Sequence, residues 1–205
     1  MKIILRIFTF LFIIIFFLIG YLSFIGFKTE RFNNQISQKI KKIDSNFEIE
    51  LKEIKIILDP FKFQLNAKTI GPKIINKKEI IEIEYFKTKI PLVSFFNKNF
   101  LIKNIEISTK SLKAKNVISF LRNFQNTSEL YILEKIIKKG YLIADINLDF
   151  DSEGNIKNNY KIKGILKDAK ISISKKYKLD NLNLAFNYNQ SILDLKDIKL
   201  YLNDL

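Results

Sequence analysis

A two-residue alternation of apolar and polar side chains runs through most of the chain and constrains its fold more than any other feature. It begins where Phe47, Ile49 and Leu51 alternate with charged residues, and it recurs as far as residues 198–202. Successive side chains of a β-strand point to opposite faces of the sheet, so each such segment has one apolar and one polar face. The sequence therefore predicts a mainly β fold with a few helices, built on a sheet of about nine strands.

Turn signals divide the first part of this alternation into strands. Asp59-Pro60 separates a strand at residues 47–56 from a second one around Phe61, Phe63 and Leu65, which predicts a hairpin. A further strand around residues 81–85 follows a second turn signal. The pattern indicates antiparallel neighbours joined by short turns.

Three helical segments interrupt the strands. Pro91 precedes a short apolar piece, residues 92–96, that suits a helical turn. Longer helices are predicted at residues 117–124 and 127–139, the second with Asn126 as its N-terminal cap and Gly140 as its C-terminal cap. These helices are too few to cover the apolar face of a large sheet. The cover would be the same sheet curling on itself, a partner protein or lipid acyl chains.

The N-terminal part contains an uncharged, strongly apolar segment, residues 7–27, which follows Lys2 and Arg6 and ends at Lys28. A helix of this length would be about 31 Å long, close to the hydrocarbon thickness of a bilayer. The alternative is a cleaved signal peptide, whose apolar region is usually about 7 to 15 residues and ends at an A-x-A-like site that is missing here. We therefore predict a short tail and a single transmembrane anchor in residues 1–28. Charge counting does not fix its orientation.

Residues 29–46 are predicted to form an amphipathic helix beside the membrane. Phe32, Ile36, Ile40 and Ile43 recur at helical spacing and share one face, and lysines occupy the other faces. Two interpretations stay open: the helix lies on anionic lipid headgroups, or it packs against the folded domain.

The residue types that are missing exclude several kinds of chemistry. The chain has no Cys and no His, so disulfides, thiol nucleophiles, Ser-His-Asp sites and the usual zinc, haem and iron–sulfur ligand sets cannot form. The net charge of +14 comes almost entirely from dispersed lysines, whereas nucleic-acid binders cluster their cations and favour arginine. We expect neither nucleic-acid binding nor a cofactor.

Two acidic groupings resemble a metal or catalytic site. Residues 149–154 partly match a calcium-binding loop, but Tyr160 occupies the position where a bidentate Glu is required, which favours a hairpin turn. Glu82 and Glu84 share one strand face and could in principle act as acid and base, but their alternation with isoleucines favours a solvated outer face. We predict no metal site, no catalytic residue and no enzymatic activity.

The order of these elements resembles the start of AsmA-like proteins. The resemblance is carried by the single span, the amphipathic helix ending near Ile43, the strand at residues 47–56, the hairpins, and the helical turn that leads into residues 100–107. The later segment at residues 164–171 resembles the repeated strand segments of the same superfamily, which includes AsmA, YhdP and TamB. The resemblance extends over nearly the whole chain, and it includes no catalytic motif.

This resemblance implies a protein of the inner membrane with a cytoplasmic N-terminus and most of its chain in the periplasm. Residues 47–205 would form an antiparallel sheet curled into an open trough that carries phospholipid acyl chains between membranes or maintains the outer membrane. The residues expected to contact lipid are Phe47, Ile49, Leu51, Phe61, Phe63, Leu65, Ile81, Ile83, Tyr85, Leu182, Leu184 and Phe186.

An alternative function is a membrane-tethered scaffold that presents an edge strand to a partner in outer-membrane protein assembly or export.

The last alternation runs to within a few residues of Leu205 without a closing turn. We therefore expect this sequence to be the beginning of a longer protein.

Overall fold

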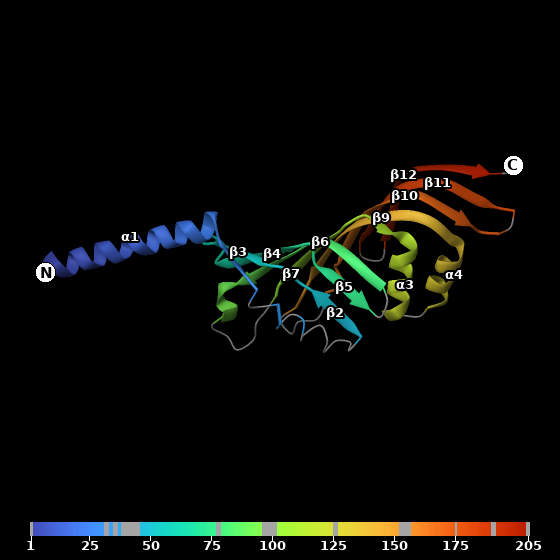
Figure 1. Cartoon of the computed structure of the whole chain (residues 1–205). Helices are drawn as coiled ribbons and strands as arrows, with labels where there is room; N and C mark the ends of the chain where they lie inside the picture. Colours follow the sequence, from blue (N-terminus) through green and yellow to red (C-terminus); the bar gives the residue numbers. More distant parts are fainter. Residues whose placement is uncertain are drawn as a thin grey trace.

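An apolar N-terminal helix leads into a large, open, antiparallel sheet of 12 strands in the computed structural model (Figure 1). This confirms the mainly β prediction and the single N-terminal helix. The sheet is open, and it is neither closed nor strongly curled. The structure describes residues 2–30, 33, 34, 37, 46–76, 79–95, 102–124, 127–151, 157–174, 176–189 and 192–203.

Among the described residues the helices are few, as the sequence indicated. Those with described bounds are α1 (Lys2–Phe24), the 3-10 helix η1 (Leu92–Phe95), α3 (Ala114–Phe124) and α4 (Ser128–Ile136). The strands are β1 (Phe27–Thr29), β2 (Phe47–Glu50), β3 (Ile54–Asp59), β4 (Gln64–Ile70), β5 (Lys73–Asn76), β6 (Glu79–Pro91), β7 (Asn104–Thr109), β8 (Leu112–Lys113), β9 (Ile137–Asp149), β10 (Lys161–Ser172), β11 (Lys178–Asn189) and β12 (Ile192–Asn203).

The main sheet follows the order β1-β3-β4-β6-β7-β9-β10-β11-β12, and β2, β5 and β8 lie off this path. Each strand of the path therefore pairs with the next one along the chain or with one close to it. β1, which follows α1, and β12 form the two ends of the order. In Figure 1 α1 extends away from the sheet at one end, and β12 lies at the other.

The N-terminal helix α1 ends at Phe24, three residues before the predicted end at Phe27. Gly26 has a positive φ of 69°, and its amide donates to the carbonyl of Tyr21 over 3.0 Å. A Cβ at position 26 would lie 2.2 Å from the carbonyl oxygen of Ile56, so this left-handed position requires glycine. Phe27 then pairs with Ile56 in β3, because strand pairing begins directly after the helix.

The predicted strand at residues 47–56 is two strands. β2 pairs with β5, whereas β3 pairs with β1 and β4. Residues 51–53 between them have no strand structure, so Leu51 is not a strand residue. The segment is divided because its two halves pair with different strands. The local alternation of apolar and polar residues does not reveal which strands pair.

The hairpin of β3 and β4 is confirmed, but two of its predicted strand residues lie in its turn. Asp59 pairs with Gln64, and the Asp59 carboxylate accepts from the Lys62 amide over 3.1 Å. Phe63 has a φ of 48°. Phe61 and Phe63 are 94% and 69% exposed. The strand prediction for these two phenylalanines is therefore wrong, since the Asp59 side chain stabilises a wider turn.

The helix α4 also ends earlier than predicted. Its N-terminal cap is Thr127, whose hydroxyl accepts from the Leu130 amide over 3.4 Å; the predicted cap Asn126 lies outside the described residues. Lys139 and Gly140, expected as the last turn and cap, belong to β9. From Ile137 onward the chain pairs with β10 instead of continuing the helix, because Ile137 is buried in a cluster with α3.

Several predictions fall wholly or mostly outside the described residues. The apolar face of the helix predicted at residues 29–46 is one, although residues 33, 34 and 37 are helical. The turn after residue 151 is another. The helical turn after Pro91 and the helix at residues 117–124 are confirmed as η1 and α3.

Helices α3 and α4 cover part of the apolar face of the sheet. Phe120 and Val117 of α3 pack on Ile81 and Ile83 of β6. A second cluster joins α3 and α4 to β9 and β10, with members Ala114, Ile118, Leu130, Ile137, Leu166 and Ile171. A third lies within β3, β4 and β6 and contains Ile54, Ile56, Ala67, Ile90 and Leu65. These helices supply part of the cover that strong curling would otherwise provide.

Candidate functional site on the apolar face of the sheet

One continuous row of mostly apolar side chains crosses the whole sheet. Directly opposed residues in antiparallel strands project to the same face, so the register connects these positions from β1 to β12. We call this set the apolar row. It consists of Thr29, Ile54, Thr69, Phe86, Ile107, Ile146, Ile162, Tyr188 and Leu193.

Burial along the apolar row decreases toward β12. Ile54 and Thr69 are buried, whereas Ile107, Ile146, Ile162 and Tyr188 are only partly buried, and Leu193 is 56% exposed. The three core clusters of the described residues contain none of the row's members on β9 to β12. The row is therefore sealed near β3 and β4 and open toward β12.

The predicted lipid-contacting residues do not lie together on one surface, and several of them are buried in the core. Ile81 and Ile83 lie in the core beneath α3, and Ile83 is only 2% exposed. Ile49 is buried, and Leu65 packs in the core cluster of β3 and β4. The side chain of Phe47 lies outside what the structure describes.

Tyr85 lies on the opposite, polar face. The register shifts between Ile83 and Tyr85, and Tyr85 pairs with the exposed Ile70. The Lys68 ammonium lies 4.5 Å from the centre of the Tyr85 ring. The facing predicted for Tyr85 is therefore wrong, because the bulge in β6 reverses the alternation.

Three predicted residues on β11 remain together. Leu182, Leu184 and Phe186 follow one another at two-residue spacing on the same face as Tyr188 of the apolar row. Leu182 is buried against Ala169 of β10, whereas Leu184 and Phe186 are partly exposed. Of the twelve predicted residues, Leu184 and Phe186 lie next to the open part of the row.

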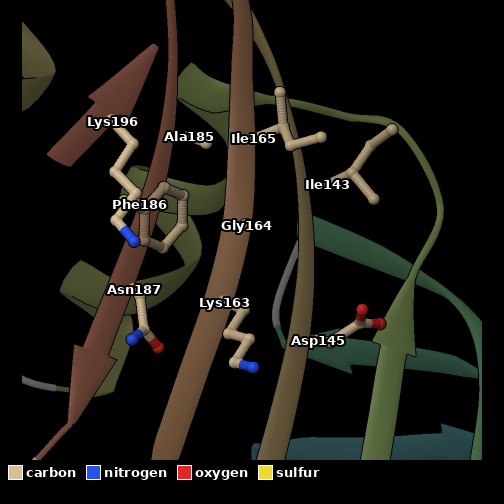
Figure 2. Close-up of a pocket in the computed structure, with 9 residues that line it drawn as sticks. All are labelled: Ile143, Asp145, Lys163, Gly164, Ile165, Ala185, Phe186, Asn187 and Lys196. Carbon is tan, nitrogen blue, oxygen red and sulfur yellow. The ribbon is translucent and has the colours of Figure 1, made fainter. Parts of the chain in front are cut away.

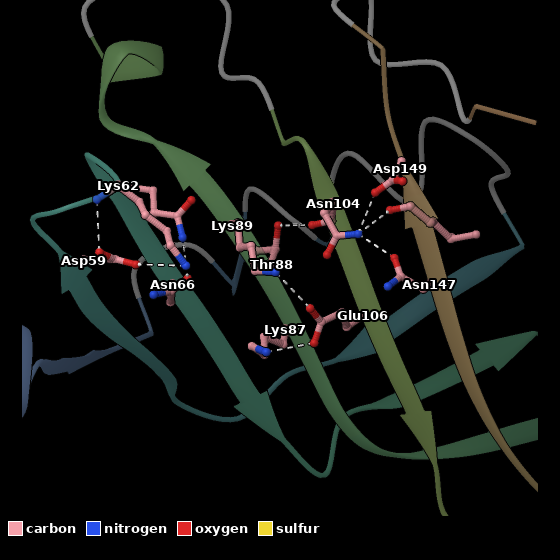
Figure 3. A network of polar contacts seen from close by, with 12 residues as sticks. Asp59, Lys62, Asn66, Lys87, Thr88, Lys89, Asn104, Glu106, Asn147 and Asp149 are labelled. Atoms are coloured by element: carbon pink, nitrogen blue, oxygen red, sulfur yellow. Dashed lines mark hydrogen bonds and ion pairs between the residues drawn. The ribbon is translucent and has the colours of Figure 1, made fainter. Parts of the chain in front are cut away.

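The opposite face of the central strands is polar and internally paired (Figure 3). Glu106 of β7 accepts from Lys87 over 2.8 Å and from Lys89 over 3.2 Å, both on β6. The hydrogen bond from Lys87 is the main reason that the pKa of Glu106 lies below its usual value, against the effect of partial burial. The Asn104 amide donates to Asp149 on β9. These charged and amide groups are therefore paired within the face, although Oδ1 of Asn104 is buried without a hydrogen-bond partner.

Glu82 and Glu84, the two carboxylates that share one strand face, are both exposed on β6. Glu82 binds Lys110 over 3.0 Å, and this hydrogen bond lowers the pKa of the Glu82 carboxyl. The prediction of a solvated outer face is confirmed. Among the residues that the structure describes, no group of three or more acidic side chains could hold a metal ion.

The structure contains a pocket of about 400 Å³ between β9, β10, β11 and β12 that the sequence patterns did not predict (Figure 2). Its cross-strand row of Ile143, Ile165, Ala185 and Lys196 lies on the otherwise polar face. Asp145, Lys163, Gly164, Phe186 and Asn187 complete the lining. The sequence signal was a pair of consecutive apolar residues in each of two strands, at residues 142–143 and 165–166, which breaks strict alternation.

The helix α1 is long and apolar enough to cross a membrane. Its 23 residues have a mean hydropathy of 2.8 in the most apolar window, and none of that window is buried. A signal sequence near an N-terminus has the same properties. The structure is thus consistent with a single membrane anchor or a signal sequence.

Comparison of the chain with protein-family models, curated proteins and solved structures finds no match. The resemblance to AsmA-like proteins therefore stays a prediction.

Proposed function

We propose that the chain is a membrane-anchored protein whose apolar row holds lipid acyl chains. The observation that carries the proposal is the continuity of this row from β1, which begins three residues after α1 ends, to the open strands β9 to β12. With neighbouring strands about 4.8 Å apart, eight strand-to-strand steps span roughly 38 Å. An acyl chain would contact the row where its side chains are partly or fully exposed, on β9 to β12, whereas Ile54 and Thr69 near α1 are buried.

The energetic basis is the hydrophobic effect. Each methylene group transferred from water to an apolar surface contributes about 0.8 kcal/mol. The partly exposed side chains Ile146, Ile162 and Tyr188 gain as well, because lipid would cover surface that the described residues leave open. The function we propose thus needs no catalytic residue and no cofactor.

The resemblance to AsmA-like proteins supports a more specific form of this proposal. In that form α1 anchors the chain in an inner membrane, the sheet lies in the periplasm, and the lipid is a phospholipid moving between membranes. The sheet would then be an open groove for acyl chains. The alternative of a scaffold for outer-membrane protein assembly stays a prediction.

The test places a photocrosslinking amino acid, benzoylphenylalanine, at Tyr188 of the full-length chain in membranes. Tyr188 belongs to the apolar row, and the replacement is aromatic like the original side chain, so the fold should tolerate it. The matched control is Asn187, the preceding residue of β11, which faces the pocket side. We expect phospholipid adducts at position 188, detected by mass spectrometry, and few or none at position 187.

Equal lipid labelling at both positions would show that the membrane surface, and not the apolar row, is the source of the adducts. Protein adducts at position 188 without lipid would favour the scaffold alternative. A second pair on β10, Ile162 with Lys163 as control, repeats the comparison one strand closer to α1. Absence of lipid at both Tyr188 and Ile162 would overturn the proposal.

A further inference from the structure

Strand β12, the last in the order of the described strands, has an unusual surface. Among the described strands it pairs only with β11. All of its described side chains are exposed, including Leu193, Leu195, Ile198, Leu200 and Leu202 on its apolar face. A long apolar edge with free backbone groups is a template for pairing with another strand.

A bulge divides β12 into two halves. Asp197 has a φ of 54°, and the register with β11 passes from Ala185–Lys196 to Asn183–Lys199. β12 therefore contains one extra residue opposite β11 at this point. The alternation changes parity there, so odd-numbered residues before the bulge and even-numbered residues after it share the apolar face.

With this bulge, β12 is complementary to a second copy of itself in antiparallel orientation. In the register where Lys196 lies opposite Lys196 of the second copy, Asp194 faces Lys199, and the leucines and isoleucine of residues 193–200 face one another. The apolar pairs are Leu193 with Leu200 and Leu195 with Ile198. By two-fold symmetry every pair occurs twice. The two Asp197 residues lie beside the central lysines and offset their repulsion.

Among the described residues of one copy, these charged side chains of β12 have no ion-pair partner. Across the ladder to β11, Asp194 faces Asn187, Lys196 faces Ala185, and Lys199 faces Asn183. No ion pair among the described residues includes Asp194, Lys196, Asp197 or Lys199. Isolated edge lysines would discourage pairing, but here acidic and basic residues alternate so that a second copy neutralises them. Opposite charges directly across a ladder stabilise it, and like charges destabilise it.

From this complementarity we propose that two copies of the 205-residue chain pair through their β12 strands and form one continuous antiparallel sheet. The dimer has closed two-fold symmetry with the same patch on both copies. α1 lies at the β1 end of the strand order, opposite β12. The two α1 helices therefore lie at the outer ends of the joined sheet and do not obstruct the pairing. The proposal is independent of lipid binding.

The first test uses the absence of cysteine from the chain. Opposed residues in an antiparallel ladder have Cα atoms about 4.5 to 5.5 Å apart, within the range that a disulfide bridges. Full-length Lys196→Cys in detergent should therefore form a disulfide-linked dimer under mild oxidation. The control is Ile192→Cys, also exposed on β12, whose two copies would lie about 26 Å apart, eight residue steps of 3.3 Å. This control should not form a disulfide-linked dimer.

The second test reverses the charges in the Lys196→Cys background. Asp194→Lys and Lys199→Asp each place like charges opposite one another and should reduce cross-linking several-fold. The double variant Asp194→Lys with Lys199→Asp restores opposite charges and should restore the dimer. Circular dichroism establishes that each variant retains its β structure, since a variant that misfolds would lose this signal.

Equal cross-linking of Lys196→Cys and Ile192→Cys would indicate random collision and overturn the proposal. So would a monomeric Lys196→Cys protein, or a double charge reversal that does not restore the dimer. A dimer that persists equally in all charge variants would place the contact elsewhere, for example between α1 helices, and would also contradict pairing through β12.

Discussion

At the scale of single residues, Gly164 on β10 has no room for a side chain. A Cβ there would lie 2.5 Å from Cζ of Phe186 and 2.6 Å from the carbonyl oxygen of Ile143. The ring of Phe186 on β11 thus occupies the space that a side chain at position 164 would take, and the backbone of β9 blocks the remaining side. We predict that Gly164→Ala lowers the free energy of unfolding by roughly 1 to 3 kcal/mol through overpacking. Chemical denaturation followed by circular dichroism measures this change.

Lys163 provides the comparison for Gly164 because it is the preceding residue of the same strand and is exposed. Lys163→Ala should change the free energy of unfolding by no more than about 0.5 kcal/mol. If Gly164→Ala were as harmless as this control, Phe186 would not be held over the glycine, and the packing of β10 against β11 described above would be incorrect.

At the scale of elements, Glu106 joins the polar faces of β6 and β7. Because its two lysine partners lower the pKa of this carboxyl in the folded state, the interaction contributes stability above the carboxyl's ordinary pKa. That contribution is lost as the pH falls through the lower, folded-state pKa. We predict that Glu106→Gln costs about 0.5 to 1 kcal/mol at neutral pH, the range of exposed ion pairs. The cost should disappear in strongly acidic solution, where the native Glu106 is also neutral.

Denaturation curves of both proteins across a pH series test this expectation. Glu84→Gln is the appropriate comparison, since Glu84 is an exposed carboxylate of β6 without an ion pair among the described residues. A stability difference between Glu106→Gln and the native chain that persisted unchanged in acid would assign the effect to packing instead of charge.

The same elements show what the sequence could predict. Period-two patterns located most strands, and they placed Leu184 and Phe186 on one face because β11 is regular there. They misplaced Tyr85 because a bulge reverses the alternation and leaves no local signal. They misplaced Phe61 because an apolar residue in a turn looks like a strand residue until the turn length is known. The apolar row itself depends on which strands pair, and that is a non-local property.

At the scale of the whole molecule, the junction of α1 with the sheet bears on whether α1 is an anchor or a cleaved signal sequence. The small residues Gly20 and Ser23 lie within α1. Gly26 closes the helix directly over Ile56 of β3, and Phe27 already belongs to the sheet. Cleavage after Gly26 would therefore leave β1 without the helix end that positions it, and it would expose the edge of β3 if β1 detached.

We accordingly predict that the mature protein retains α1 and remains in the membrane. The physical reason is that α1 and β1 form one folded junction, and that a helix of this length and hydropathy is stable in a bilayer. The measurements are the intact mass of the protein isolated from cells and its distribution after alkaline extraction of membranes. A mass that includes residues 1–26, found in the membrane pellet, is the expected result. A protein shortened by the length of α1 and released into the soluble fraction would contradict it, and it would remove the membrane connection on which the lipid proposal depends.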